Sequence, residues 1–246
     1  MMDVVRSEWT KIRSVRSTVW TLVVTVLLMI GFSALLSGSA RVNGGGPLTL
    51  SNALSLSVAG GLLATISLAA LGVLVISSEY RTGGIRTTLA AVPNRYKLLT
   101  GKLIVFTATA LVAAAVSTAA AIAIGLAISR PIGFDLAEVV RAGFGNTLYL
   151  TACGVFGFGL GTLIRHTPGA IVSAIALMMV LPQLTTMLPG EWGRVVSDYF
   201  TTNAGSLIVA HRSNDSLGPW AGFGVYLAWI AVSVLAGAVL MRRRDA

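Results

Sequence analysis

Long stretches without a charged residue alternate with short polar segments along this chain. Residues 42–78 and 103–129 hold no Asp, Glu, Lys or Arg. A helix needs about 20 apolar residues to cross the hydrocarbon layer of a membrane, and these stretches reach that length. The pattern predicts an all-α fold with six membrane-spanning helices, at residues 18–36, 50–78, 103–129, 142–164, 168–188 and 221–241.

Glycine and proline mark several of the predicted helix ends. Residues 44–47 read Gly-Gly-Gly-Pro and separate the first two helices, and Pro131 follows the third. Pro168 stands in the first turn of the fifth helix, where its missing N–H would have had no partner. Pro182 lies inside that helix, so we expect a kink there, with neighbouring groups satisfying the freed carbonyl.

Composition supports an integral membrane protein. The 246 residues are 55% hydrophobic and 11% charged, with a mean hydropathy of +0.82, whereas soluble domains carry about 25% charged residues. The net charge of +9 does not indicate nucleic-acid binding, because the basic residues form short clusters between apolar stretches. A single cysteine, Cys153, excludes an intramolecular disulfide.

Basic residues gather on one side of the predicted membrane. With the N-terminus inside, 13 of the 18 Lys and Arg residues lie on the inner side and five on the outer side. Because cytoplasmic loops are enriched in Lys and Arg, we predict that both termini are cytoplasmic. The first apolar stretch is also open to interpretation as a secretory signal, but it exceeds the roughly 7–15 apolar residues of such signals.

The segment before the first predicted span, residues 1–17, has the pattern of an amphipathic helix. Val5, Trp9, Ile12 and Val19 fall on one face at 100° per residue, and basic and hydroxyl residues occupy much of the rest. Such a helix lies in the membrane interface, with its basic face toward anionic lipid. The alternative is that its Arg and Lys residues only anchor the topology.

The segment between the second and third spans, residues 79–102, is polar and basic and carries a second short amphipathic pattern. Ile85, Leu89 and Val92 recur at the spacing of one helical face, Gly83 precedes them, and Pro93 stops the helix. A simple reversal of the chain needs fewer residues. We therefore expect a partner groove to receive this apolar face, although the same face could instead lie flat on lipid.

At these two segments the sequence resembles the membrane subunits of ABC-2 type permeases, of the actinobacterial kind without an ATPase domain. The resemblance spans the whole chain as one transmembrane domain, 1–246, and is carried by SEWTKIRSVRSTVW and by SSEYRTGGIRTTLAAVPNRYKLLTGK. It implies a type V exporter fold with an N-terminal connecting helix, to which we assign Val5, Glu8, Trp9, Ile12 and Arg13. It also implies a coupling helix docked on the ATPase subunit, to which we assign Glu79, Gly83, Gly84, Ile85, Arg86, Leu89, Val92, Pro93 and Arg95.

The match to the family pattern is incomplete at one point. The family usually has an acidic residue followed by Gly-Thr, and here Glu79 is followed by Gly83 and Gly84, so that Gly84 departs from it. From the residues alone, Glu79 has two interpretations. It pairs with Arg81, Arg86 or the connecting helix, or it is a solvated charge at the interface. The resemblance favours a hinge or docking role for Glu79.

The resemblance implies a permease subunit in a bacterial plasma membrane that exports an amphipathic drug, lipid or peptide. The chain would pair with a second permease, identical or related, and with ATPase subunits that hold ATP and Mg²⁺. No phosphate-binding loop is present in the sequence, so hydrolysis is expected only in the partner. Neither a metal-ligand pattern nor a catalytic nucleophile is apparent, and we expect no metal, no catalytic residue and no cofactor bound directly by this chain.

Two other functions are compatible with six spans. A non-transporting protein, such as an immunity or assembly factor, would bind a cytoplasmic partner through the same segment. An ion-coupled carrier is disfavoured, because we expect no charged residue well inside a span. The outer segment 189–220 is bracketed by Trp192 and Trp220. Its polar side chains are expected to be solvated, with a gating role as the alternative.

Overall fold

The computed structural model describes residues 2–43, 48–83, 95–209 and 211–243. These residues are almost entirely helical, and 87% of them lie in helices. In the described ranges there is no β-strand, and an isolated backbone bridge joins Thr49 to Ile132. The predicted all-α fold is confirmed.

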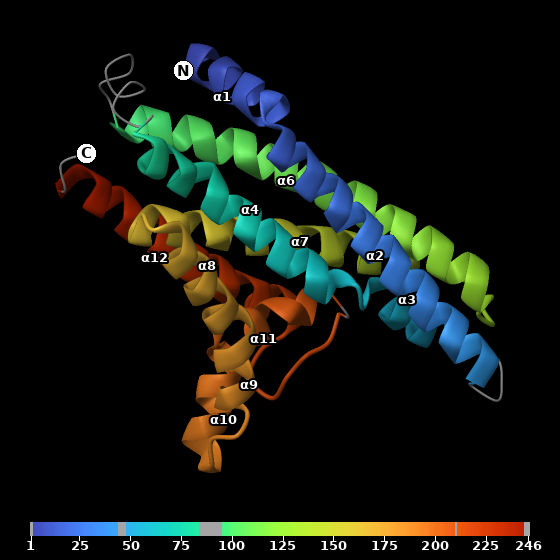
Figure 1. Cartoon of the computed structure of the whole chain (residues 1–246). Coiled ribbons are helices and arrows are strands. Elements are labelled where there is room, and N and C mark those ends of the chain that lie inside the picture. Colours follow the sequence, from blue (N-terminus) through green and yellow to red (C-terminus); the bar gives the residue numbers. More distant parts are fainter. Residues whose placement is uncertain (1, 44–47, 84–94, 210, 244–246) are drawn as a thin grey trace.

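The N-terminal half contains an outer helix and three spans (Figure 1). Its elements are α1 (Met2–Ser14), α2 (Arg16–Asn43), α3 (Leu50–Val58), α4 (Gly61–Thr82) and α6 (Arg95–Ser129). The C-terminal half adds α7 (Leu136–Ile164), α8 (Thr167–Ile175), the π-helix η1 (Ala176–Val180), α9 (Leu181–Thr185), α10 (Gly190–Tyr199), α11 (Thr201–Gly205), the 3₁₀ turn η2 (Ser206–Ile208) and α12 (Pro219–Arg243).

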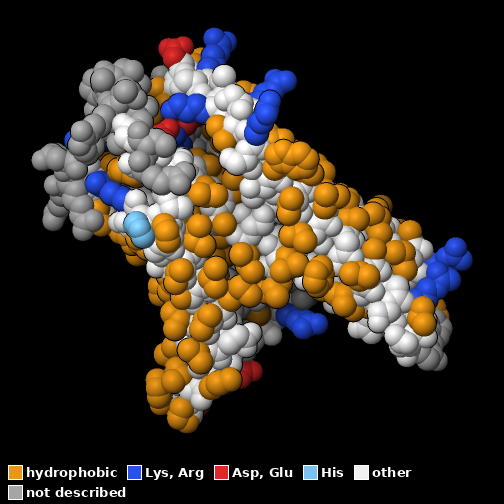
Figure 2. Space-filling model, in the orientation of Figure 1, with side chains coloured by type: hydrophobic (Ala, Val, Ile, Leu, Met, Phe, Trp, Pro, Cys, Tyr) orange, Lys and Arg blue, Asp and Glu red, His pale blue; other side chains and the backbone are white. Residues whose placement is uncertain are grey.

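Six helical segments among the described residues are long and apolar enough to cross a membrane, and the chain is a multi-pass membrane protein. They run over Arg16–Asn43, Leu50–Tyr80, Arg95–Ser129, Leu136–Ile164, Thr167–Thr185 and Pro219–Met241. Hydrophobic side chains cover the middle of the molecule, and Lys and Arg gather toward its ends (Figure 2). Both chain ends lie at one end of the bundle (Figure 1), here called the terminal end, and the opposite end is the distal end.

The pair α4 and α7 forms the centre of the bundle. A Cβ at Gly157 of α7 would lie 2.2 Å from the carbonyl oxygen of Ala69 on α4, so the two backbones are in direct contact there. Small residues permit such an approach between membrane helices, where close packing replaces the hydrophobic effect as the driving force. The Gly157-x-x-x-Gly161 spacing in the sequence is thus part of the tightest contact between these helices.

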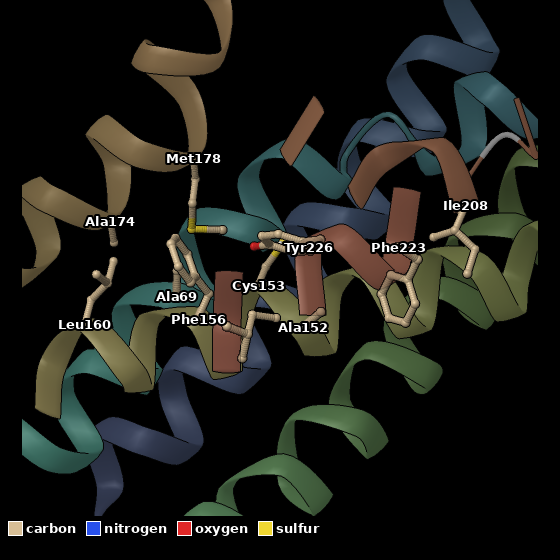
Figure 3. Packing of buried hydrophobic residues seen from close by; sticks show 11 residues of the cluster. Ala69, Ala152, Cys153, Phe156, Leu160, Ala174, Met178, Ile208, Phe223 and Tyr226 are labelled. Carbon is tan, nitrogen blue, oxygen red and sulfur yellow. Dashed lines mark hydrogen bonds between the residues drawn. The ribbon is translucent and has the colours of Figure 1, made fainter. Parts of the chain in front are cut away.

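A hydrophobic cluster joins α7 to α8, η1 and α12 (Figure 3). Tyr226 of α12 is fully buried in it, and its hydroxyl donates to the Cys153 sulfur at 3.4 Å. Met178 of η1 extends toward the same pair, and Phe156 packs against the Tyr226 ring at a centroid distance of 5.8 Å. Cys153 is therefore a packed core residue.

The second span is interrupted, which the sequence analysis did not predict. Helix α3 ends at Val58, and α4 begins at Gly61 after a tight turn. A Cβ at Gly60 would lie 3.0 Å from the Met29 carbonyl oxygen of α2, so α2 approaches the chain at this turn. The span predicted over 50–78 is present, but it is divided into two helices at Gly60-Gly61, a turn signal that the prediction did not use.

The fifth span changes its hydrogen bonding just before Pro182. The π-helix Ala176–Val180 precedes that residue, whose ring cannot be accommodated beside the carbonyl four residues earlier, at Met178, in a regular α-helix. The hydroxyl of Thr202 donates to the Met178 carbonyl at 2.8 Å, and that of Thr201 donates to the Leu177 carbonyl at 2.7 Å. Neighbouring groups thus satisfy the disturbed backbone, as expected.

Candidate functional site

Helix α1 packs along the first turns of α6 at the terminal end (Figure 1). Its buried residues are Glu8 and Ile12, and Val4 packs beside Gly101 of α6. An ionisable side chain in the centre of a packed face is unusual, since a buried carboxylate is stable only when it is paired. The partners of Glu8 therefore decide how α1 is held.

Glu8 belongs to a cluster of four charged side chains from α1, α4 and α6, here called the ion cluster. Lys102 Nζ of α6 donates to Glu8 Oε2 at 2.5 Å and to Glu79 Oε1 at 2.8 Å. Lys11 Nζ of α1 donates to Glu8 Oε1 and to Glu79 Oε1, each at 2.9 Å. Two carboxylates and two ammonium groups alternate, so the cluster carries no net charge.

Burial differs across the ion cluster. The side chains of Glu8 and Lys102 are each 2% exposed, and those of Glu79 and Lys11 are 14% and 43% exposed. Partial burial lowers the pKa of Lys11, but hydrogen bonds and attraction from Glu8 and Glu79 outweigh this effect and raise the pKa above its usual value. The cluster is thus a desolvated link between three helices, with Lys11 on its solvent side.

A cleft of about 310 Å³ lies against the ion cluster. Its walls come from the junction of α1 and α2 and from the last turns of α4, including Thr18, Leu74 and Ser78. The second oxygen of Glu79, Oε2, is buried and accepts no hydrogen bond from the described residues. The ion cluster therefore has one unused acceptor beside this cleft.

Two arginines link the remaining helices at the terminal end. Arg95 at the start of α6 donates to the Met241 carbonyl at 2.6 Å, and Arg165 after α7 donates to the Leu240 carbonyl at 3.2 Å. Both carbonyls belong to the last turns of α12, where a cation also favours the helix dipole. The Arg165 guanidinium lies 4.8 Å from the centre of the Tyr80 ring on α4. These contacts and the ion cluster hold this end of the bundle together.

The face of the N-terminal helix that packs on the bundle is centred on Glu8. Trp9 is 51% exposed, whereas Ile12 is 9% exposed and Glu8 is fully buried. Of the apolar stripe expected in the membrane interface, Ile12 is buried against the bundle and Trp9 is exposed, and its contact with lipid stays a prediction. Arg13 is exposed.

The residues assigned to the coupling segment are only partly described. Glu79 pairs with the connecting helix, which is one of the alternatives left open by the sequence, and also with Lys102. Gly83 ends α4 with a φ of 70°, and Arg95 begins α6. The remaining assigned residues lie outside the described residues: Gly84, Ile85, Arg86, Leu89, Val92 and Pro93.

Sequence reasoning missed Lys102 and Lys11 as site residues. Lys102 was interpreted as a flanking charge before a span at 103–129, but α6 begins at Arg95, and Lys102 lies about two turns inside it. Because α6 has 35 residues and about 20 suffice to cross the hydrocarbon layer, a place two turns from its start does not put Lys102 well inside the span, and the expectation that no charged residue lies there stays a prediction. The available signal was the pair Glu79 and Lys102, which directly flank the charge-free stretches 42–78 and 103–129.

No group of three His, Cys, Asp or Glu side chains in the described part of the chain is arranged to hold a metal ion. Compared with models of known protein families and with curated proteins, the sequence matches none. The arrangement of α1, α4 and α6 therefore carries the functional argument.

Proposed function

We propose that this chain is the transmembrane subunit of an ABC-2 type exporter, powered by a separate ATPase subunit. The observation that carries the proposal is the ion cluster, which fastens the amphipathic helix α1 to the ends of α4 and α6. Those two ends flank the segment 84–94, in which the sequence predicts a coupling helix. The six-span all-helical fold agrees with such a subunit.

The ion cluster suits the transmission of movement from a partner to the spans. Separating Glu8 from Lys102 would leave charges unpaired in a desolvated place, which costs several kcal/mol. Helices α1, α4 and α6 should therefore move together when a partner pushes on the connection between α4 and α6. A link of weak surface ion pairs would instead yield before it transmitted force.

In the proposed complex the terminal end faces the cytoplasm of a bacterial cell. The excess of 13 Lys and Arg residues over five supports this orientation. Two permease subunits, identical or related, would combine with two ATPase subunits that bind ATP and Mg²⁺. Exposed apolar side chains on several spans are available for contact with lipid or with the second permease.

The proposal is tested by purifying the tagged chain from its native membrane under mild conditions. We expect a stoichiometric partner with a phosphate-binding loop, ATP hydrolysis by the complex, and no hydrolysis by the chain alone. Identification of a stoichiometric cytoplasmic partner without such a loop would replace the exporter with a non-transporting membrane protein. Hydrolysis by the isolated chain would also contradict the proposal.

A further inference from the structure

Two adjoining hollows open at the distal end of the bundle. The outer hollow, of about 340 Å³, lies between α3, the start of α7 and the residues after η2. The deeper hollow, of about 490 Å³, continues between α4, α7 and the π-helix η1. Both are lined by Ser55, Val58, Val209 and Arg212, so they adjoin, and the two together are here called the distal cleft.

The outer part of the distal cleft is lined by charges of both signs. Arg141 and Arg212 contribute two cations, and Asp135 and Glu138 contribute two carboxylates. Asp135 accepts a hydrogen bond from the Ala137 backbone at 2.9 Å, and none of the four forms an ion pair with a described residue. Balanced but unpaired charges around one hollow favour a ligand that itself carries both charges.

The deeper part of the distal cleft has a different character. Leu62, Met178, Met179 and Leu207 supply apolar walls, beside uncharged polar side chains such as Asn146. Methionine side chains are flexible and adapt to the shape of an apolar ligand. Both methionines belong to η1, and π-helical turns are frequent at functional sites.

The cleft has the length of a lipid chain. Along α7 it extends from Asp135 to Tyr149, which corresponds to about 21 Å at 1.5 Å per residue. Its size lies in the range of small-molecule sites, about 300–1,000 Å³. A charged outer part joined to a more apolar inner part, about 21 Å long together, fits a molecule with a compact head and one chain.

We propose that the distal cleft binds a zwitterionic amphiphile, with its anionic group near Arg141 and Arg212 and its cationic group near Glu138. The hydrocarbon chain lies in the deeper part, between α4, α7 and η1. The conclusion that this ligand is an exported substrate rests on the proposed function, whereas the binding of the ligand does not. A membrane lipid and an exported substrate share this chemistry, and the experiment below separates them.

The test uses the purified chain in nanodiscs of anionic lipid and a fluorescent single-chain probe with a phosphocholine head. Two probes with the same chain, one with a phosphate head and one with a trimethylammonium head, provide the comparison. We expect the zwitterionic probe to bind at least tenfold more tightly than either. Equal binding of the three probes would overturn the inference.

Variants locate the probe within the cleft. Arg141→Ala with Arg212→Ala should weaken binding about a hundredfold, and Leu62→Trp, which fills the deeper part, about tenfold. Arg194→Ala is the matched control, since Arg194 is an exposed distal arginine outside the cleft, and it should change binding less than twofold. Thermal unfolding curves verify that each variant is folded. Wild-type binding by the folded double variant would contradict the assignment.

These outcomes remain distinct from the test of the exporter proposal. Binding of the probe requires no ATPase. An ATPase complex that does not bind the probe would therefore refute only the proposal that the distal cleft binds this ligand. Probe binding by a chain that has no ATPase partner would support the distal cleft as a binding site and refute the exporter proposal. In the full complex, ATP-driven loss of the bound probe identifies an exported substrate, whereas unchanged occupancy identifies a resident lipid and removes the substrate assignment.

Discussion

Replacement of Lys102 by Met should release α1 from the bundle. The variant removes the cation that donates to both Glu8 and Glu79, while Lys11 remains to face two carboxylates. The cluster then carries a net charge of −1 around Glu8, which is 2% exposed. Removal of one partner from a buried ion pair costs about 3–5 kcal/mol.

A loss of this size is large enough to detect as undocking of the helix. Each 1.4 kcal/mol is a factor of about ten, so the ratio of docked to undocked α1 should fall at least a hundredfold. Ile12 lies on the packed face of α1 and is 9% exposed. A cysteine at this position therefore reports undocking by its rate of maleimide labelling. The native Cys153 is buried and should contribute little background.

Two further variants distinguish the loss of ion pairing from a general disruption of helix packing. Glu8→Leu combined with Lys102→Met leaves Lys11 with Glu79 as a neutral pair, and should recover most of the protection of Ile12→Cys. Arg13→Met, which removes an exposed cation from α1 itself, should label like the parent. If Lys102→Met also labels like the parent, the ion cluster does not hold α1, and the reasoning is refuted.

Two other predictions concern the fold. Thr202→Val leaves the Met178 carbonyl without its 2.8 Å donor and should lower the free energy of unfolding by about 1–3 kcal/mol. Thr186→Val, on the exposed surface, is the control and should lower it by less than about 0.5 kcal/mol. Thermal unfolding in detergent compares the two variants, and equal melting temperatures would contradict the role of Thr202. Cysteines at Thr87 and Ser213 should label from opposite sides of the membrane, with Thr87 accessible from the cytoplasm, and labelling of both from outside would refute the six-span topology.

The spans could be predicted from the sequence because membrane insertion depends on local composition. Charge-free stretches of sufficient length gave the number of crossings, and Pro182 correctly indicated a disturbed fifth helix. Gly60-Gly61 is a local turn signal, but such a pair alone does not decide the break between α3 and α4. The break depends on how closely α2 approaches Gly60, which is a property of packing between distant segments.

The ion cluster shows a second limit of local patterns. Glu8 and Lys102 are 94 positions apart, so periodicity could only place Glu8 among the polar residues of α1 and Lys102 among the flanking charges. Their burial follows from the angle at which α1 meets α6, and no short window of sequence contains that angle. The stripe through Trp9 was expected to face the membrane interface, so it gave no indication of the packed face.

The central claim is that an ATPase docks on this subunit through the segment between α4 and α6. The sequence pattern places Ile85, Leu89 and Val92 on its apolar face, and Arg86 away from that face. The decisive measurement is co-purification of the ATPase with Leu89→Asp and with Arg86→Ala, each verified as folded. A charge in a desolvated contact costs several kcal/mol, so Leu89→Asp should lower the affinity more than a hundredfold, and Arg86→Ala should change it little. Full docking and hydrolysis with Leu89→Asp would contradict the account.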